Sequence, residues 1–387
     1  MSGVCVAKGF TAAGVKAGIK KSGKHDVALI FSDRPAAVAG TFTTNLAAAA
    51  PVIVSRQRAD ADFARGVIIN SGCANACTGE AGYADAVAMA DEAARLLGVA
   101  SGEILVCSTG LIGSSLPMDK IMLGIQEAVG ALAPRDDGAI LAIMTTDSQP
   151  KRIANTHSDG WSIGGIAKGA GMIAPNMATM LAFITTDAIV DPALLKSLLR
   201  QSVLESFNRI TIDADTSTND SVIALANGAS GKTPTTEDMK EALDAVCRSL
   251  AEQIVADGEG ATKFARIRVR GAISSDEALR AARTVAESSL VKTALYGQDA
   301  NWGRIAAALG RAGVEIDFTR LSISIADRVV LKEGQPASKE TIALARAGMA
   351  EREIIIVCDL ALGRFATEVL TTDLSPEYVV LNAEYEL

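Results

Sequence analysis

Four short segments of the chain concentrate small polar residues within apolar surroundings. They are residues 70–79, 108–113, 145–147 and 168–180. Buried hydroxyl and amide groups cost free energy unless they are hydrogen-bonded. Each segment taken alone is better explained as a Gly-rich turn whose hydroxyls are satisfied. Several of them placed after strands indicate a site lined by backbone N–H and hydroxyl groups.

The sequence lacks the motifs of the commoner phosphate, metal and hydrolase sites. In a phosphate-binding loop the lysine follows the glycines, whereas here Lys168 comes before Gly169 and Gly171. Residues 257–263 also lack the G-x-x-x-x-G-K-[ST] motif. No stretch has EF-hand spacing. His25 and His157 are the only histidines, and no G-x-S-x-G segment is present. These absences argue against Cys/His zinc sites and against a Ser-His-Asp hydrolase.

A threonine at a chain N-terminus is a remaining type of nucleophile. Its hydroxyl is weak without a base, but its own α-amino group can serve as that base. An α-amine has an ordinary pKa of about 7.7–8.0, so it can accept a proton near neutral pH. Such a terminus inside a chain requires the chain to cut itself. The Ala178-Thr179 bond is a chemically reasonable place, although spacing alone does not single it out.

Apolar patterning predicts the elements that would position these segments. Short apolar runs predict strands at residues 27–31, 67–70, 104–107, 140–144, 180–186, 264–269, 354–358 and 378–382. Helical spacing predicts helices at about 81–97, 192–207, 237–256, 277–287 and 339–349. Residues 289–303 are expected to be a loop. We therefore expect an α/β protein with domains at 1–285 and 286–387.

Composition limits the classes of partner. The 387 residues carry a formal net charge of −8, and only 4% are aromatic, so neither nucleic acid nor an anionic membrane surface is an expected partner. Residues 169–186 are uncharged, but Pro175 and Asn176 argue against a spanning helix. The N-terminus has no apolar signal region. Six scattered cysteines without a C-x-x-C pair favour a reduced, cytoplasmic location.

The segment at residues 168–181 resembles the self-cleavage segment of the ornithine acetyltransferase family, also called glutamate N-acetyltransferase. The resemblance runs nearly end to end. It includes residues 9–19, 70–79, 108–113, 257–264, 297–305 and 381–385. Several long motifs in the right order make this signal far more specific than any one Gly-rich loop.

The resemblance implies a particular mechanism. The precursor would cut itself between Ala178 and Thr179, and Thr179 would become the N-terminal nucleophile. It would take the acetyl group from N-acetylornithine as an acyl-enzyme and pass it to glutamate in a ping-pong cycle. Thr109 and Gly110 would form the oxyanion hole with a hydroxyl and a backbone N–H. The reaction would need no metal or bound cofactor, although some members also use acetyl-CoA as a substrate.

The family's substrate-binding positions match a further set of residues. They are Lys168, Thr179, Glu259, Asn382 and one of the pair Thr145 and Thr146, of which we favour Thr145. A lysine can pair the carboxylate of a zwitterionic amino acid, and a glutamate can pair its ammonium group. The family usually has Ser or Thr where this chain ends in Leu387, whose α-carboxylate could substitute for the hydroxyl.

The resemblance also implies an architecture and an assembly. It predicts an αββα-like core of packed sheets flanked by helices, a smaller C-terminal α/β domain, and an α2β2 heterotetramer of the two cleaved chains. Two alternatives remain open from sequence. One is a self-processed aminopeptidase or amidase that uses water as the acceptor. The other is a non-catalytic binding protein that keeps the fold, which failure to self-cleave would favour.

Overall fold

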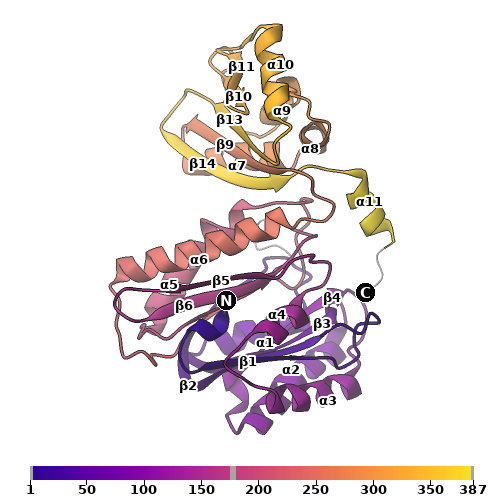
Figure 1. The fold of residues 1–387 in the computed structure, drawn as a ribbon, viewed down its shortest axis with the longest axis vertical. Helices are drawn as coiled ribbons and strands as arrows, with labels where there is room; N and C mark the ends of the chain where they lie inside the picture. Colours follow the sequence, from indigo (N-terminus) through magenta and orange to yellow (C-terminus); the bar gives the residue numbers. More distant parts are fainter. Residues whose placement is uncertain (1–2, 175–179, 385–387) are drawn as a thin grey trace. The chain divides into compact units, whose positions relative to one another are not determined.

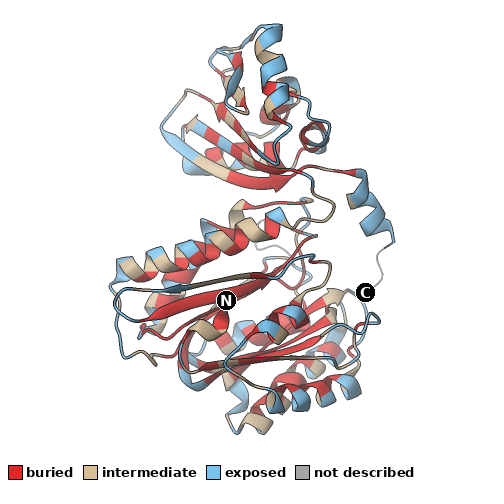
Figure 2. Ribbon diagram, in the orientation of Figure 1, coloured by how far each residue is buried: buried red, intermediate tan, exposed pale blue. Residues whose placement is uncertain are grey.

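The computed structural model describes residues 3–174 and 180–384 and divides them into two compact units. The first contains the described residues up to 208 together with 215–254, and the second contains 209–214 and 255–384. The domain boundary expected at residues 285/286 falls inside the second unit. Figure 1 shows the fold, and Figure 2 shows that buried residues follow the strands and the inward faces of the helices.

The first unit is built on one eight-stranded sheet with strand order β4-β3-β2-β8-β7-β6-β5, and β1 pairs with β2. The strands are β1 (Phe10–Val15), β2 (Val27–Phe42), β3 (Phe63–Cys73), β4 (Ile104–Leu111), β5 (Lys151–Thr156), β6 (Ser162–Lys168), β7 (Leu181–Thr186) and β8 (Ser221–Ala226). The long strand β2 belongs to both halves of the sheet. Its first part pairs with β1 and β3, its last part pairs with β8, and the register with β3 shifts between Phe31 and Ala36.

The two halves of this sheet share one apolar core. Ile30 and Leu105 from one half pack in the same cluster as Ile166 and Phe183 from the other. Neighbouring residues on each strand face the opposite side, as the two-residue repeat of a strand requires. Ile104 and Val106, for example, join a second core against the helices.

Helices pack on both halves of the sheet, and the one at residues 137–143 joins the core that the two halves share. They are α1 (Ala50–Ala59), α2 (Gly79–Leu97), α3 (Met118–Gly130), α4 (Asp137–Ile143), α5 (Pro192–Leu204) and α6 (Thr236–Ala256), with short 3-10 turns at Val4–Val6, Ser101–Glu103 and Phe207–Arg209. Side chains of α2 and α3 pack on β2 and β3. Helix α6 lies so close to β6 that a Cβ at Gly165 would contact Leu250 and Val246 at 3.1 and 3.3 Å. The predicted α/β core of packed sheets between helices is confirmed.

One predicted strand of this unit is wrong. Residues 140–144 lie in helix α4 and the residue after it. Short apolar runs do not distinguish a strand from a buried helix. Ala139, Ile140, Ala142 and Ile143 are buried while Leu141 is 43% exposed, which is the pattern of one helix face rather than of a strand. The start of α5 is as predicted, because Asp191 accepts a hydrogen bond from Leu194 N and Pro192 follows it.

The second unit has a six-stranded sheet of order β12-β11-β10-β13-β9-β14. Its elements are β9 (Phe264–Ala272), α7 (Ser275–Ala286), α8 (Ser289–Tyr296), α9 (Trp302–Gly310), β10 (Ser322–Ile325), β11 (Arg328–Lys332), β12 (Gln335–Pro336), α10 (Lys339–Gly348), β13 (Glu353–Asp359), β14 (Phe365–Thr372) and α11 (Pro376–Ala383). Alternate residues of β9 and one face of α7 share a core of their own.

Two predictions for this unit are wrong. The loop expected at 289–303 is helix α8 and the start of α9 except for residues 297–301, which connect them, and the strand expected at 378–382 is part of helix α11. Ser375 caps α11 by accepting a hydrogen bond from Tyr378 N, and Pro376 opens the helix. Val379, Val380 and Leu381 are β-branched or apolar and read as a strand, yet they are exposed. The cap and the proline therefore decide the local structure.

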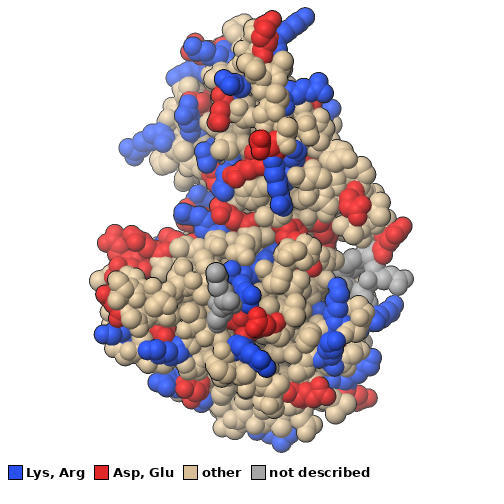
Figure 3. Space-filling view, in the orientation of Figure 1, with Lys and Arg blue, Asp and Glu red and all other residues tan. Residues whose placement is uncertain are grey.

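Within residues 3–174 and 180–384, no helix is long and apolar enough to cross a membrane. The uncharged run at 169–186 ends in strand β7. On the face drawn in Figure 3, acidic and basic side chains are interspersed. This face has no continuous basic patch of the kind that nucleic-acid binding requires.

Candidate active site

The predicted oxyanion residues lie where two parallel strands end. β3 and β4 run in register, so that Ser71 lies beside Thr109 and Gly72 lies beside Gly110. Gly110 has a φ of +133°, and a Cβ there would lie 2.4 Å from the carbonyl carbon of Gly72. Only glycine can adopt this close approach. The segments at 70–79 and 108–113 therefore meet at one edge of the sheet.

Lys168 reaches this edge from another strand. It is the last residue of β6, and its Nζ donates a hydrogen bond to Thr109 Oγ1 at 3.3 Å. Both residues are buried, with 2% and 3% exposure. Because the Thr109 oxygen accepts this bond, its own proton is available for a different acceptor. The pair thus combines a buried positive charge with a hydroxyl donor.

Asp147 holds the ends of two segments beside Lys168. Its Oδ1 accepts hydrogen bonds from Lys151 Nζ and Gly169 N, both at 2.6 Å, and its Oδ2 accepts one from Thr145 N at 3.0 Å. Burial alone would raise the pKa of this carboxyl. The positive charges of Lys168 and Lys151, with the hydrogen bonds from Gly169 and Lys151, outweigh burial and lower the pKa to about 2. Asp147 is therefore a fixed negative charge that orients the backbone at Thr145 and Gly169.

Lys20 is buried next to the same segment. Its Nζ donates to the carbonyl oxygens of Met144 at 2.6 Å and His25 at 2.7 Å. Burial lowers the pKa of this ammonium to about 8. The carboxylate of Asp26 binds the backbone N–H groups of Ala17 and Ile19 in the same loop. The loop between β1 and β2 is thereby tied to the residues that lead into Thr145.

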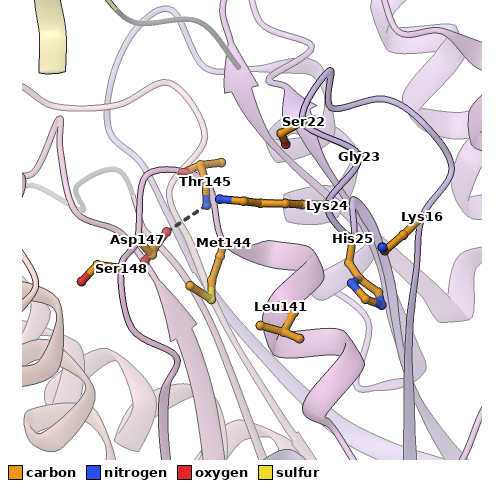
Figure 4. A pocket seen from close by; sticks show the side chains of 10 residues that line it. All are labelled: Lys16, Ser22, Gly23, Lys24, His25, Leu141, Met144, Thr145, Asp147 and Ser148. Atoms are coloured by element: carbon orange, nitrogen blue, oxygen red, sulfur yellow. Dashed lines mark hydrogen bonds between the residues drawn. The ribbon is translucent and has the colours of Figure 1, made fainter.

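A cavity of about 470 Å³ opens beside Thr145. Figure 4 shows Lys24 pointing across it toward Thr145, with Lys16 and His25 near one another on the same loop. Burial and the charge of Lys16 lower the pKa of His25. The lining is Lys16, Ser22, Gly23, Lys24, His25, Leu141, Met144, Thr145, Asp147 and Ser148. Thr145 belongs to this lining and Thr146 does not.

A second group of predicted residues lies in the other unit. Asn382 on α11 donates a hydrogen bond from Nδ2 to Glu259 Oε2 at 2.8 Å and another to Tyr378 O at 3.0 Å. Both side chains of the pair are at least partly exposed. The structure thus brings Glu259 and Asn382 together, as it brings together Thr109, Lys168 and the Thr145 segment in the first unit.

The remaining predicted residues lie outside the described part of the chain. These are Ala178, Thr179 and Leu387. The described residue nearest in sequence to the predicted nucleophile is Met180, which immediately precedes β7 and is buried.

Sequence reasoning missed Lys20, Lys151 and the role of Asp147. Asp147 was part of a noted small polar segment, and a lysine four residues after it was a readable signal for an ion pair. Lys20 had no such signal, because its partners are backbone carbonyls. Among residues 3–174 and 180–384, the side chains close enough to share a metal ion are His157, Asp159 and Asp238, none of which was a predicted site residue.

Paired strand ends with a hydroxyl and an N–H, backed by a buried ammonium, are the features of an α/β enzyme that stabilises an oxyanion. The chain belongs to the ArgJ family, which matches residues 11–387. This confirms the family predicted from the motifs.

Individual relatives agree. The chain is 47% identical to the arginine biosynthesis bifunctional protein ArgJ of Mycolicibacterium paratuberculosis, over 99% of this chain and 96% of that protein. A solved ArgJ from Bacillus halodurans is 40% identical, with a TM-score of 0.51, over 52% of this chain and 98% of that one. An ornithine acetyltransferase from Mycobacterium tuberculosis, solved in complex with ornithine, is 47% identical, with a TM-score of 0.44, over 45% of this chain and 95% of that one.

Proposed function

We propose that this enzyme transfers the acetyl group of N-acetylornithine to glutamate, as a step of arginine biosynthesis. The observation that carries the proposal is the buried Lys168–Thr109 pair beside Gly110, because it joins the oxyanion donors on β4 to the last residue of β6, the strand that leads into the predicted cleavage segment. The relatives named for arginine biosynthesis and the ornithine-bound acetyltransferase support the same substrate class.

The nucleophile of the proposal is Thr179 after self-cleavage at Ala178. Its α-amine takes the hydroxyl proton while Oγ1 attacks the acetyl carbonyl carbon. The tetrahedral oxyanion accepts hydrogen bonds from the Thr109 hydroxyl and the Gly110 N–H. One such donor commonly lowers the barrier by about 3 kcal/mol. The C–N bond then breaks, the ammonium proton passes to the departing amine of ornithine, and an acetyl ester remains on Thr179.

Glutamate completes the cycle. Its α-amine attacks the ester carbonyl, the C–O bond breaks, and a proton returns to Thr179 Oγ1. Each step uses only a nucleophile, a base and an oxyanion site, which the chain itself supplies. A metal or a bound cofactor is therefore not part of the proposal. Acetyl-CoA, as an alternative donor, would form the same acyl-enzyme.

Substrate recognition uses both groups of residues. The ammonium group of Lys168 pairs a substrate carboxylate, while Glu259, oriented by Asn382, pairs an ammonium group. Thr145 takes the role of the substrate-binding threonine, because it lines the cavity beside Asp147. Leu387 takes the position at the substrate site where the family usually has Ser or Thr. We place the enzyme in the cytoplasm as an α2β2 heterotetramer.

Two alternatives from the sequence are less well supported. A hydrolytic aminopeptidase or amidase would need water to outcompete glutamate at the acyl-enzyme. The identity of 47% over 99% of the chain to an arginine biosynthesis enzyme favours the transferase. The same identity to a biosynthetic enzyme argues against a non-catalytic binding protein.

The decisive experiment is intact-mass spectrometry under denaturing conditions. We expect two chains, of residues 1–178 and 179–387, and one acetyl group on the second chain after N-acetylornithine is added without glutamate. That acetyl group should leave when glutamate is added. A split chain that never becomes acetylated would contradict the substrate, and a single uncut chain would contradict the mechanism. The Thr179→Ala variant is the control, because it should be neither cut nor acetylated.

A further inference from the structure

The dipeptide Asn219-Asp220 contacts both halves of the proposed site without being part of it. It immediately precedes strand β8, and its two residues are 5% and 0% exposed. Asn219 Nδ2 donates hydrogen bonds to the carbonyl oxygens of Ala74 at 2.7 Å and Ser108 at 2.9 Å. Ser108 is the residue before Thr109. The Asn219 side chain therefore holds the peptide that leads into Thr109.

Asp220 holds the other half. Its Oδ1 accepts a hydrogen bond from Met180 N at 3.0 Å, and the N–H of Ser221 donates to Met180 O at 3.2 Å. Both backbone polar groups of Met180 are thus held by one short segment. Met180 is the residue that directly follows Thr179 in sequence.

The segment that makes these contacts is anchored to the sheet. Thr43 N donates to Asp220 O at 3.0 Å, and Thr43 Oγ1 donates to Ser217 O at 2.7 Å. Asn219 Oδ1 accepts a hydrogen bond from Thr218 Oγ1 at 2.6 Å. Both the oxygen and the nitrogen of the Asn219 amide thus form hydrogen bonds within the protein. This is typical of a side chain that positions neighbouring backbone groups.

Burial raises the pKa of Asp220 well above its ordinary value, against the opposing hydrogen bond from Met180 and the charge of Lys168. Burial raises this pKa because it penalises the charged form of the carboxyl. A neutral carboxyl and a carboxamide have the same shape and both offer an oxygen to Met180 N. Asparagine is accordingly a conservative replacement here.

We propose that Asn219 and Asp220 are positioning residues that set the spacing between the oxyanion donors at Thr109 and Gly110 and the nucleophile Thr179. The proposal rests on the proposed function in that it takes Thr179 as the nucleophile. Its physical basis is that a misplacement of about 1 Å between reacting groups can cost about 10²-fold in rate. The dipeptide binds both the Ser108 carbonyl and the Met180 N–H, so it restricts changes in the distance between these two groups.

Asn227 provides a matched control at the opposite end of the same strand. It is also a buried asparagine, with 7% exposure, and its Nδ2 donates to Lys8 O at 2.9 Å and Ser32 Oγ at 3.2 Å. Its Oδ1 accepts from Ala229 N at 3.0 Å. Asn227→Ala removes the same kinds of hydrogen bond from β8, but contacts neither strand end of the site.

The test compares Asn219→Ala, Asp220→Ala, Asp220→Asn and Asn227→Ala. Three quantities are measured: the self-cleavage rate by intact mass, kcat and KM for N-acetylornithine, and Tm. We expect Asn219→Ala and Asp220→Ala to slow cleavage and lower kcat at least tenfold, with KM within about threefold of the wild type. Asp220→Asn should restore both rates to within about threefold. Asn227→Ala should lower Tm while leaving kcat unchanged.

Each other outcome has a defined meaning. Wild-type kcat and cleavage in both alanine variants would overturn the positioning role, as would an equal loss of kcat in Asn227→Ala. If an alanine variant does not fold, Asn219→Ser replaces it, since serine is too short to reach both carbonyls and the same loss is expected. If the wild type itself is neither cut nor acetylated on Thr179, the proposed function fails first, and the variants are not needed to show it.

Discussion

The hydroxyl oxygen of Thr109 has two roles in the proposed mechanism. Its Oγ1 accepts the hydrogen bond from Lys168, and its proton remains for the developing oxyanion. Thr109→Val keeps the shape and removes both contacts. We expect kcat for N-acetylornithine to fall about 10²–10³-fold with little change in KM, because the donor acts mainly in the transition state. Thr109→Ser should recover most of the loss in steady-state assays. Equal activity in the valine variant would exclude the hydroxyl from the oxyanion site.

Asp147 makes stability depend on pH in an acidic window. Its pKa of about 2 in the folded state lies below the ordinary value of about 3.9 in an unfolded chain. Its contribution is therefore complete above about pH 4 and is lost as pH falls toward 2. Asp147→Asn should cost about 3–5 kcal/mol in free energy of unfolding near neutral pH, since it removes a charge partner of buried lysines.

The measurement is urea unfolding of wild type and Asp147→Asn between pH 3 and pH 7. The difference between the two free energies should narrow as pH falls below about 4. Asp159→Asn, whose side chain is 66% exposed, should show no comparable effect. A difference that stays constant with pH would contradict the assignment of this charge.

Candidate site residues can be named from the sequence, but the partners that surround them in the fold cannot. Thr109 and Lys168 are 59 residues apart in the chain, and only the family resemblance connected them. The lowered pKa of Asp147 depends on Lys168 and Gly169, which reach it through a strand pairing that no local pattern encodes. Lys20 binds backbone carbonyls, and a sequence gives no sign of such partners.

Elements were predictable where their periodicity was long or their caps were explicit. Helices α2 and α5 lie close to their predicted bounds, and the strands predicted at 67–70 and 104–107 are parts of the longer strands β3 and β4. Helix α4 and helix α11 were misread because each is only a few residues of mostly apolar sequence. In such short runs, tertiary packing and the capping residue decide between helix and strand. The same limit applies to any site residue that a short element carries, including Asn382.

Helix α11 is expected to contribute to substrate binding rather than to the stability of the fold. None of its side chains is buried, and Asn382 is bonded to Glu259. Truncation after Ser375 should therefore change the free energy of unfolding of the enzyme by less than about 1 kcal/mol. We expect kcat/KM for N-acetylornithine to fall at least tenfold, because Glu259 loses the amide that orients it.

Asn382→Ala in the full-length chain is the companion to this truncation. It leaves the helix in place and should reproduce at least half of the loss in kcat/KM on a logarithmic scale. A truncated enzyme that keeps wild-type kcat/KM in the same assay would remove both Asn382 and Leu387 from substrate binding, because the truncation deletes both of them.

The proposed cleavage would leave two chains interwoven at the scale of the whole molecule. Strand β6 belongs to the first chain and pairs with β7 of the second, and β2 of the first pairs with β8 of the second. Phe183 and Ile223 of the second chain lie in the same core as Ile30 and Leu105 of the first. The cut enzyme should therefore migrate as one species in size exclusion.

The chains should separate only in denaturant, which size exclusion in buffer and in urea can show. The uncut Thr179→Ala variant is the reference for elution volume. Recovery of either chain alone from the native column would mean that the strand pairings across the cut are weaker than their burial implies.

The pairing of β6 with β7 also means that refolding would differ before and after the proposed cleavage. Both strands enter the sheet while they are covalently joined, so their search for each other is that of a hairpin within one chain. After the cut, the same pairing would have to be found by two separate molecules. A denatured precursor can refold as a single chain. A denatured enzyme that has been cut would have to reassemble from two chains, which becomes slow at high dilution. Unfolding of the cut enzyme would therefore be effectively irreversible. Its lifetime would depend on the unfolding rate rather than on the equilibrium free energy of unfolding.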